Sequence, residues 1–209
     1  MNGSFTVLTV CAVLVAGVFA SSCQVFAKSD GLAGEATNAN AAKEIQALRE
    51  PGEGHEIFAA LSGMWNYTMT VRETPDAAPI VSTGTSNNKR VLDSRFLQLK
   101  SEGKVVVNGK EENFEGRGFM GFDNVKQHYD FVWMDNLGTT MGIGHGVMDV
   151  ATKTINGEGV YSDPVKGAEQ VYRSALKIIN ANEYSYTVYV KGDSGKEFPS
   201  VEISYKRQK

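Results

Sequence analysis

The sequence contains few side chains of the kinds that catalyse reactions or bind metals. Its three histidines, His55, His128 and His145, are far apart in the chain, and no H-E-x-x-H pattern joins them. No G-x-S-x-G nucleophile motif is present, and the alternating glycines at 142–146 lack the Lys-Ser/Thr ending of a phosphate-binding loop. We therefore expect no metal and no cofactor, although a site assembled in three dimensions from His128, His145 and a carboxylate remains an alternative.

Carboxylates form a second candidate group, because several of them lie in the expected central strands. Asp135 follows Trp133 by two residues, so both side chains share one face of a strand. If that face is the inner one, the carboxylate is buried and needs a partner. A network of this carboxylate and its basic partners could close one end of a barrel, anchor a ligand or take part in acid–base catalysis. The candidate partners are Arg95, Arg117 and Arg173.

Aromatic residues at alternate positions form the largest group. Trp65 and Tyr67 alternate with polar residues, and 127–135 repeats the pattern, which indicates strands with one buried face. This face is either an ordinary core or the wall of a lumen that holds a small apolar or amphipathic ligand. The candidate lumen residues are Trp65, Tyr67, Arg95, Glu115, Tyr129, Trp133, Asp135 and His145. Tyr161, Tyr172, Tyr184 and Tyr186 extend the aromatic set.

The elements that must position these side chains are short strands joined by turns. Alternating segments predict about ten strands, among them 91–100, 104–107 and 139–150, and one short helix over 55–61. Asn156-Gly157 is typical of a hairpin turn. No β-α-β alternation is present, and twelve of the 22 glycines fall between 103 and 167, where we expect them to bend the sheet. These features predict an antiparallel barrel or a strongly bent sheet.

The N-terminus has the composition of an export signal. Residues 1–27 contain no charged side chain, and 5–20 is almost wholly apolar. This stretch is shorter than the ~20 residues of a membrane-spanning helix and fits the hydrophobic region of a signal peptide. Cleavage before Cys23, in the lipobox-like sequence ASSC, would leave a lipid on that cysteine. Cleavage after Ala27 and an uncleaved anchor helix are the alternatives.

We expect three segments: a signal peptide over 1–22 (or 1–27), a flexible tether over 23–50 with a marginal helix at 41–50, and a β-barrel domain over 51–209. Export places the protein in the periplasm or on a membrane of the cell envelope. Cys11 lies inside the signal, so the barrel contains no cysteine and no disulfide. The net charge of −3 argues against a nucleic-acid partner.

Several short stretches have a spacing that is shared within a known family. They include LSGMW at 61–65, FEGRGFMGFDN at 114–124, Tyr129-x-x-x-Trp133-x-Asp135 and EISYKR at 202–207. Over 50–207 the chain resembles the bacterial exported domain-of-unknown-function family number 1579. The resemblance implies an all-β, antiparallel calycin-like barrel or half-barrel of about eight to ten strands with one short N-terminal helix, and no established activity. The start Gly63-x-Trp65 with a late Arg is also similar to the lipocalin closure, in which an Arg covers a Trp.

Three functions are compatible with these expectations. The first is a noncatalytic binding module for a small hydrophobic or amphipathic ligand, based on the aromatic inner faces. The second is a structural or interaction protein of the cell envelope with a solid barrel core. The third is an enzyme, which would need two of Glu115, Asp135 and His145 to converge on one substrate atom. We expect binding rather than catalysis, with a lipid-anchored contact to a membrane surface if Cys23 is acylated.

Overall fold

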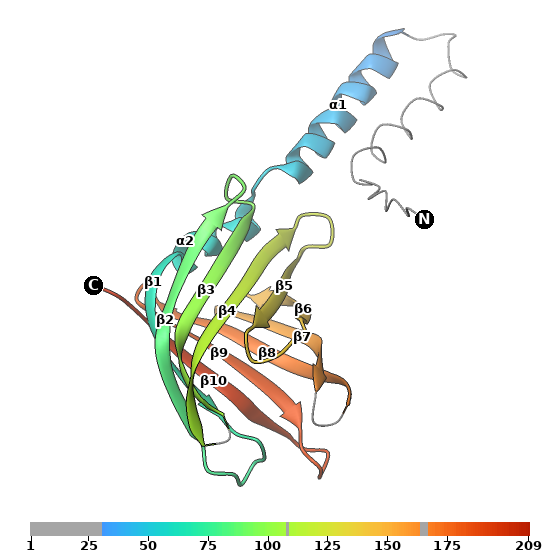
Figure 1. The fold of residues 1–209 in the computed structure, drawn as a ribbon. Helices are drawn as coiled ribbons and strands as arrows, with labels where there is room; N and C mark the ends of the chain where they lie inside the picture. The colour runs from blue at the N-terminus through green and yellow to red at the C-terminus, as the bar shows by residue number, and fades with distance from the viewer. Residues whose placement is uncertain (1–30, 108, 164–166) are drawn as a thin grey trace, which may run out of the picture. The chain divides into compact units, whose positions relative to one another are not determined.

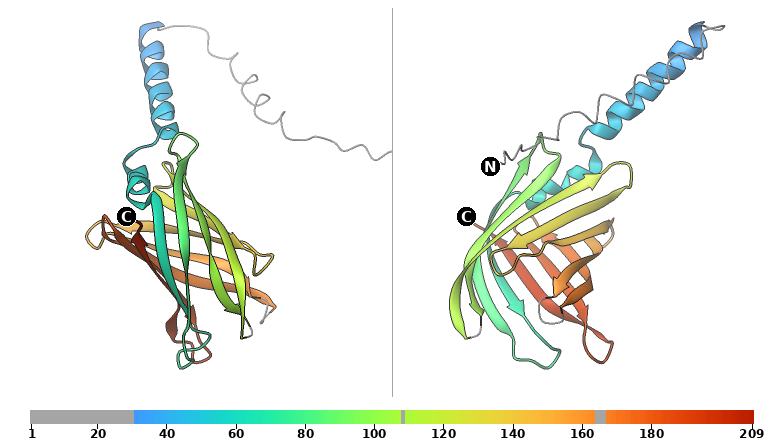
Figure 2. Two further views of the ribbon diagram at one scale, coloured as in Figure 1. Left: turned by 60° about the vertical axis from the view of Figure 1, so that its left-hand side comes forward. Right: turned by 45° about the vertical axis from the view of Figure 1, so that its right-hand side comes forward.

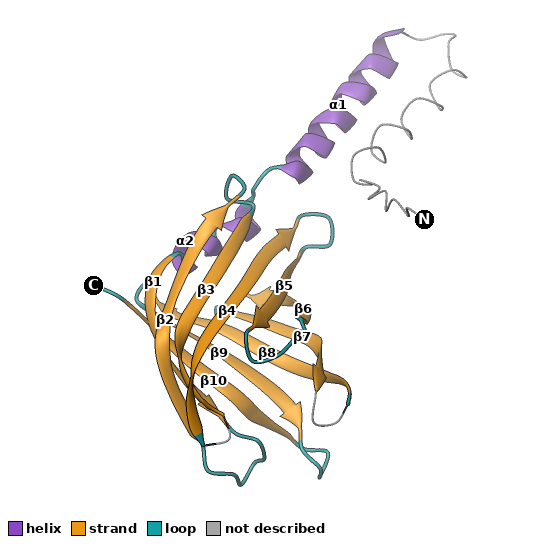
Figure 3. Ribbon diagram, in the orientation of Figure 1, coloured by secondary structure: helices purple, strands orange, loops and turns teal. Residues whose placement is uncertain are grey.

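Ten antiparallel strands form a closed barrel in the computed structural model, which describes residues 31–107, 109–163 and 167–209 (Figure 1, Figure 3). Each strand pairs with the next along the chain, and β1 pairs with β10 to close the sheet. This order is an up-and-down meander. The strands are β1 (Gly63–Val71), β2 (Ile80–Val91), β3 (Phe96–Val107), β4 (Lys110–Asp123), β5 (His128–Asp135), β6 (Gly142–Asp149), β7 (Thr154–Asp163), β8 (Ala168–Asn180), β9 (Glu183–Lys191) and β10 (Glu197–Arg207).

Helical segments come before the strands: α1 (Gly31–Arg49), η1 (Glu53–His55) and α2 (Ile57–Leu61). The helix expected at 41–50 therefore begins earlier, and 31–40, which we expected to be part of a flexible tether, belongs to α1. The segment 31–40 contains three alanines, and alanine has the highest helix propensity of any residue type. Among the described residues, no helix is long and apolar enough to cross a membrane. The predicted signal segment and Cys23 lie outside the described residues.

The chain divides into two compact units after Ile45, and the second unit contains the barrel. One end of this barrel is closed where β1 begins. Trp65 donates its indole N–H to the Leu61 carbonyl oxygen over 2.9 Å, which fixes α2 against the strand. The Arg207 guanidinium lies 4.1 Å from the centre of the Trp65 ring. It also donates to the carbonyl oxygens of Ala60 and Ser62. The late Arg thus covers the Trp, as the resemblance to the lipocalin closure implies.

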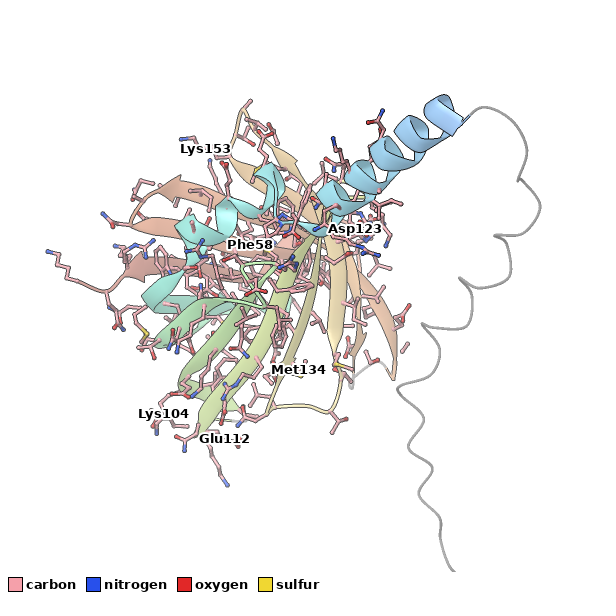
Figure 4. The ribbon with its side chains drawn as sticks, turned by 90° about the horizontal axis from the view of Figure 1, so that it is seen from above. Phe58, Lys104, Glu112, Asp123, Met134 and Lys153 are labelled. Atoms are coloured by element: carbon pink, nitrogen blue, oxygen red, sulfur yellow. The ribbon has the colours of Figure 1, made fainter. Side chains whose placement is uncertain are left out.

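The interior next to the closed end contains a cluster of buried hydrophobic side chains. The Phe58 ring meets Tyr129 at 6.3 Å, and the Trp65 ring meets Tyr184 at 4.7 Å. The buried Asn88 side chain donates to the Tyr184 hydroxyl over 3.0 Å, so these polar groups have partners. Figure 4 looks onto this end and labels Phe58. The closed half of the barrel is therefore a core.

The number of strands agrees with the prediction, but β3 is one strand where the sequence predicts a break at 101–103. The turn that precedes β3 contains Leu92, Asp93 and Ser94, whose φ angles are 51°, 55° and 66°. Left-handed residues are usually glycine or asparagine. A left-handed turn built without glycine gives no clear signal in the sequence, so the prediction misses its position.

β7 is a strand that the sequence prediction missed, and the hairpin turn expected at Asn156-Gly157 is wrong. Both residues lie within β7, and Gly157 faces the interior. A Cβ at this position would come within 2.9 Å of the Phe131 ring and the Ser174 hydroxyl. The glycine is required by its neighbours on adjacent strands rather than by a turn.

Candidate functional site

The barrel opens between β8 and β9, at the end opposite α2. The register between these strands begins at Arg173 opposite Tyr189. Among the described residues beyond that pair, 168–172 pair with β7 and 190–191 with β10, and the two segments do not pair with each other. A hollow of about 960 Å³ lies at this end and is lined by outward-facing side chains such as Val171 and Arg173 as well as by inward-facing ones. Its volume is within the size range of small-molecule sites. Figure 2 shows the barrel from two further sides.

The inner wall of the hollow contains aromatic rings from three strands. Tyr161 on β7 and Tyr172 on β8 have ring centres 6.2 Å apart, and the buried Phe198 on β10 lines the same hollow. Burial raises the pKa of Tyr161 above its ordinary value, and the nearby Asp163 charge adds to this effect. The phenol therefore stays protonated at neutral pH. The wall therefore presents aromatic ring faces and hydroxyl hydrogen-bond donors to the hollow.

Charged side chains surround the mouth and are mostly acidic. Six carboxylates line the hollow, against three basic groups from Arg72, Arg173 and Lys191. Arg72 pairs with Glu202, and Arg173 pairs with Glu197 over 3.1 Å. These pairs are partly exposed and each contributes at most about 1 kcal/mol. The rim thus has an excess of negative charge. The carboxylates are those of Glu73, Asp76, Glu158, Asp163, Asp193 and Glu197.

A chain of hydroxyl groups runs along the wall from Tyr172. The Tyr186 hydroxyl lies near the hydroxyl groups of Tyr172 and Ser174 and interacts electrostatically with them. Burial raises the pKa of Tyr172 and of Tyr186, so both phenols remain neutral donors. Because Tyr172 also lines the hollow, its oxygen offers a polar contact that is already oriented by the residues behind it.

Deeper in the barrel, the Tyr67 hydroxyl is buried and has no hydrogen-bond partner among the described residues. It lies against the backbone of Gly84 and Gly103, where a Cβ would come within 2.4 and 2.5 Å of the oxygen. Burial raises the pKa of Tyr67. An unmet buried hydroxyl costs about 1–3 kcal/mol, and a ligand oxygen or an ordered water would satisfy it.

Trp133 and Asp135 face the interior from β5, as predicted, but the carboxylate has a different partner. Trp133 donates its indole N–H to Asp135 Oδ2 over 3.0 Å, and the Leu137 N–H donates to Oδ1 over 3.0 Å. The carboxylate is therefore satisfied without an arginine. The Trp133 ring lies over Gly116 and Gly118 of β4, where any Cβ would collide with it.

The arginines expected to pair with Asp135 make other contacts. Arg95, in the turn before β3, donates to Glu50 over 2.8 Å and so fastens the segment that enters the barrel. Arg117 pairs with Glu115 on the outer face of β4. Arg95 and Glu115 therefore do not lie in the lumen, where the sequence analysis placed them.

His145 also lies outside the lumen, on the outer face of β6. Its side chain is 51% exposed. The inner positions of this strand belong to glycines, and a Cβ at Gly144 would come within 2.5 Å of the Phe131 ring. The face of 139–150 that carries the larger side chains is thus the outer one, which reverses the prediction. Neighbouring aromatic rings occupy the space above the glycines.

The catalytic alternative required two of Glu115, Asp135 and His145 to converge on one substrate atom, and no two of these side chains do so. Asp135 faces the interior near the open end, whereas the other two face outward on different strands. Trp65, Tyr67 and Tyr129 face the interior as predicted. Of these three, Trp65 and Tyr129 belong to the closed half, where they donate to backbone carbonyls.

Sequence analysis missed Phe198 and Gln170 as residues of the hollow. Both belong to segments with an alternating pattern, and the signal that could have found them is their position on the inner side of that pattern. What the pattern does not reveal is that β8 and β9 separate there.

The fold and site define a class: an up-and-down β-barrel with one closed and one open end. The chain belongs to the family described as protein of unknown function (DUF1579), whose model matches residues 50–207. No curated protein matches the sequence significantly.

Two solved structures share the barrel fold. Rv2717c from M. tuberculosis is 16% identical, with a TM-score of 0.53 over 77% of this chain and 100% of that one. The S-type phycobiliprotein lyase CPES from Guillardia theta is 11% identical, with a TM-score of 0.52 over 74% of this chain and 92% of that one. At these identities the similarity establishes the fold alone.

Proposed function

We propose that the barrel is a noncatalytic binding module for a small amphipathic molecule. The observation that carries this proposal is the hollow of about 960 Å³ at the open end, whose wall includes Tyr161, Tyr172 and Phe198. Ring faces bury the apolar part of a ligand, and a few fixed polar groups orient it. The up-and-down meander and the Arg207–Trp65 contact support a calycin-like classification of the barrel.

The charge around the mouth narrows the ligand class. Six carboxylates face three basic side chains there, and two of the basic groups already have acidic partners. Like charges at a binding surface disfavour association. The ligand therefore has a neutral or positively charged polar end, next to an apolar body that fits between the aromatic rings.

Export to the periplasm or cell envelope is part of the same proposal. It is supported by the absence of charged residues in 1–27 and by the apolar stretch at 5–20. A lipid on Cys23 would hold the barrel at a membrane surface, where apolar molecules concentrate. The net charge of −3 supports a partner other than nucleic acid.

The solid closed half supports a second candidate, an interaction protein of the cell envelope whose interior only stabilises the fold. The two candidates differ in what the open half does. In the first it takes up a molecule from solution, and in the second it remains filled with water.

A dye-binding experiment separates these candidates. N-phenyl-1-naphthylamine, a small apolar dye, should bind with a rise in fluorescence. Val190→Trp places an indole in the hollow and should weaken dye binding about 10-fold or more. Each tenfold rise in Kd corresponds to a loss of about 1.4 kcal/mol of binding free energy. Val147→Trp is the matched control, because Val147 is 58% exposed on the outer face of β6. Equal dye binding by both variants, at unchanged Tm, would exclude the hollow as the site.

A further inference from the structure

A cluster of side chains that can bind metals lies on the outer face of β4 and β5, away from the hollow. Asp123, at the end of β4, is opposite His128 at the start of β5. Asp130 follows two residues later on the same outer face. One side-chain atom from each of the three lies within 4.8 Å of the others. Figure 4 labels Asp123 in its view onto the closed end of the barrel.

His128 has an unusual environment, because its Nε2 atom is buried and has no hydrogen-bond partner in the part of the chain that the structure describes. The nitrogen lies 3.1 Å from Asp130 Oδ1, at an angle that does not suit a hydrogen bond. Two polar atoms so placed resemble neighbouring ligands of one ion. Ligands about 2.0–2.1 Å from a tetrahedral Zn²⁺ lie roughly 3.3 Å from each other.

The Asp123 carboxylate is held in place by the turn that follows β4. Its Oδ1 accepts the backbone N–H groups of Val125 and Lys126 over 2.8 and 3.0 Å. The second oxygen, Oδ2, lies 3.7 Å from the Lys126 ammonium group.

A second imidazole lies beside this cluster. His145 on β6 is opposite Asp130, and its ring centre is 5.3 Å from that of His128. Its Nε2 is 3.6 Å from a Glu158 oxygen, and the side chain is about half exposed. An exposed side chain changes rotamer readily, so the ring can turn toward the cluster.

We propose that Asp123, His128 and Asp130 bind a divalent transition-metal ion, with His145 as the fourth ligand. Imidazoles combined with carboxylates suit Zn²⁺ and related ions, whereas carboxylates alone suit Ca²⁺ or Mg²⁺. The bound ion would join the β4–β5 hairpin to β6 on the outer wall of the barrel. Asp123, His128 and Asp130 do not line the hollow, so their test is separate from that of the proposed ligand.

Zn²⁺ titration of the full chain, purified without a histidine tag, tests this site. Calorimetry should show one bound Zn²⁺ per chain, and Zn²⁺ should raise the Tm whereas Ca²⁺ should not. Co²⁺ should give the visible absorption of a nitrogen- and oxygen-ligated ion. His128→Asn and Asp130→Asn should each lower Zn²⁺ affinity at least about 10-fold, since even the residues behind metal ligands contribute about 10–100-fold.

Two further variants test the role of Asp123. Asp123→Asn keeps an oxygen for the turn but removes the charge, and it should weaken Zn²⁺ binding. Asp149→Asn is the matched control, because Asp149 makes the same turn contacts and lies opposite Thr154 rather than a histidine. Zn²⁺ affinity that is equal in the wild type, His128→Asn and Asp123→Asn, or a Tm rise with Ca²⁺ equal to that with Zn²⁺, would overturn the proposal.

Discussion

The Tyr67 hydroxyl group differs from the other buried polar groups that line the inside of this barrel. Most buried polar groups have partners: Asn88 bonds to Tyr184, and Tyr129 bonds to the Gly54 carbonyl. The Tyr67 hydroxyl has none among the described residues. A native interior rarely leaves such a group unmet. The alternation of 65–71 predicts that Tyr67 points inward, but no sequence pattern reveals whether its oxygen has a partner.

Tyr67→Phe removes this oxygen and keeps the ring. Because the hydroxyl is desolvated without compensation, we expect the free energy of unfolding to rise by about 1 kcal/mol. Urea denaturation of the ligand-free protein measures the change. If the hydroxyl contacts the ligand, the same variant should bind the ligand more weakly.

Tyr184→Phe is the control for this measurement. Its hydroxyl accepts a hydrogen bond from the buried Asn88 side chain, so its removal should lower the free energy of unfolding by about 1 kcal/mol. Equal losses in the two variants would show that Tyr67 has a partner in solution, such as a trapped water.

At the scale of the strands, inward glycines make room for large rings on the neighbouring strand. Gly116 and Gly118 of β4 lie under Trp133, and Gly144 of β6 lies under Phe131. The sequence analysis correctly placed the glycine excess in the central strands but attributed it to bends. A glycine has no side chain to mark the inner face, and for this reason the two faces of β6 were reversed.

Gly116→Ala tests the fit between β4 and β5. The added Cβ would come within 2.2 Å of Trp133 Cζ2, so the indole must move. Overpacking of this kind costs about 1–3 kcal/mol, and we expect that loss in the free energy of unfolding together with a shift in tryptophan emission. Gly138→Ala is the control, since no atom of the described residues lies within 4 Å of a Cβ there. A loss of similar size in both variants would contradict this account.

At the scale of the whole barrel, closure depends on the contact between the first and last strands. β1 and β10 pair over Trp65–Val71 and Val201–Arg207. Arg207 adds contacts beyond this pairing: it covers Trp65 and donates to Ala60, Ser62 and Ala181. The terminal sequence predicted this contact through the resemblance to the lipocalin closure.

Arg207→Ala should lower the free energy of unfolding by about 2 kcal/mol, because hydrogen bonds from a charged group contribute about 1.5–3 kcal/mol. Arg207→Lys should lose most of the same amount, since an ammonium group cannot reproduce the planar fork of donors. Denaturant unfolding measures both. Wild-type stability in the lysine variant would show that charge over the Trp65 ring is sufficient.

The sequence by itself determined the barrel class, the closed end and five of the eight inward positions predicted for the lumen. Alternation is local, and so it reports which side chains share a face. Only the tertiary structure decided where β8 and β9 separate, which face of β6 points inward and that His128 and His145 meet. These facts depend on register between strands that are distant in the chain. Register is set by side chains of neighbouring strands packing together, and no single segment contains that information.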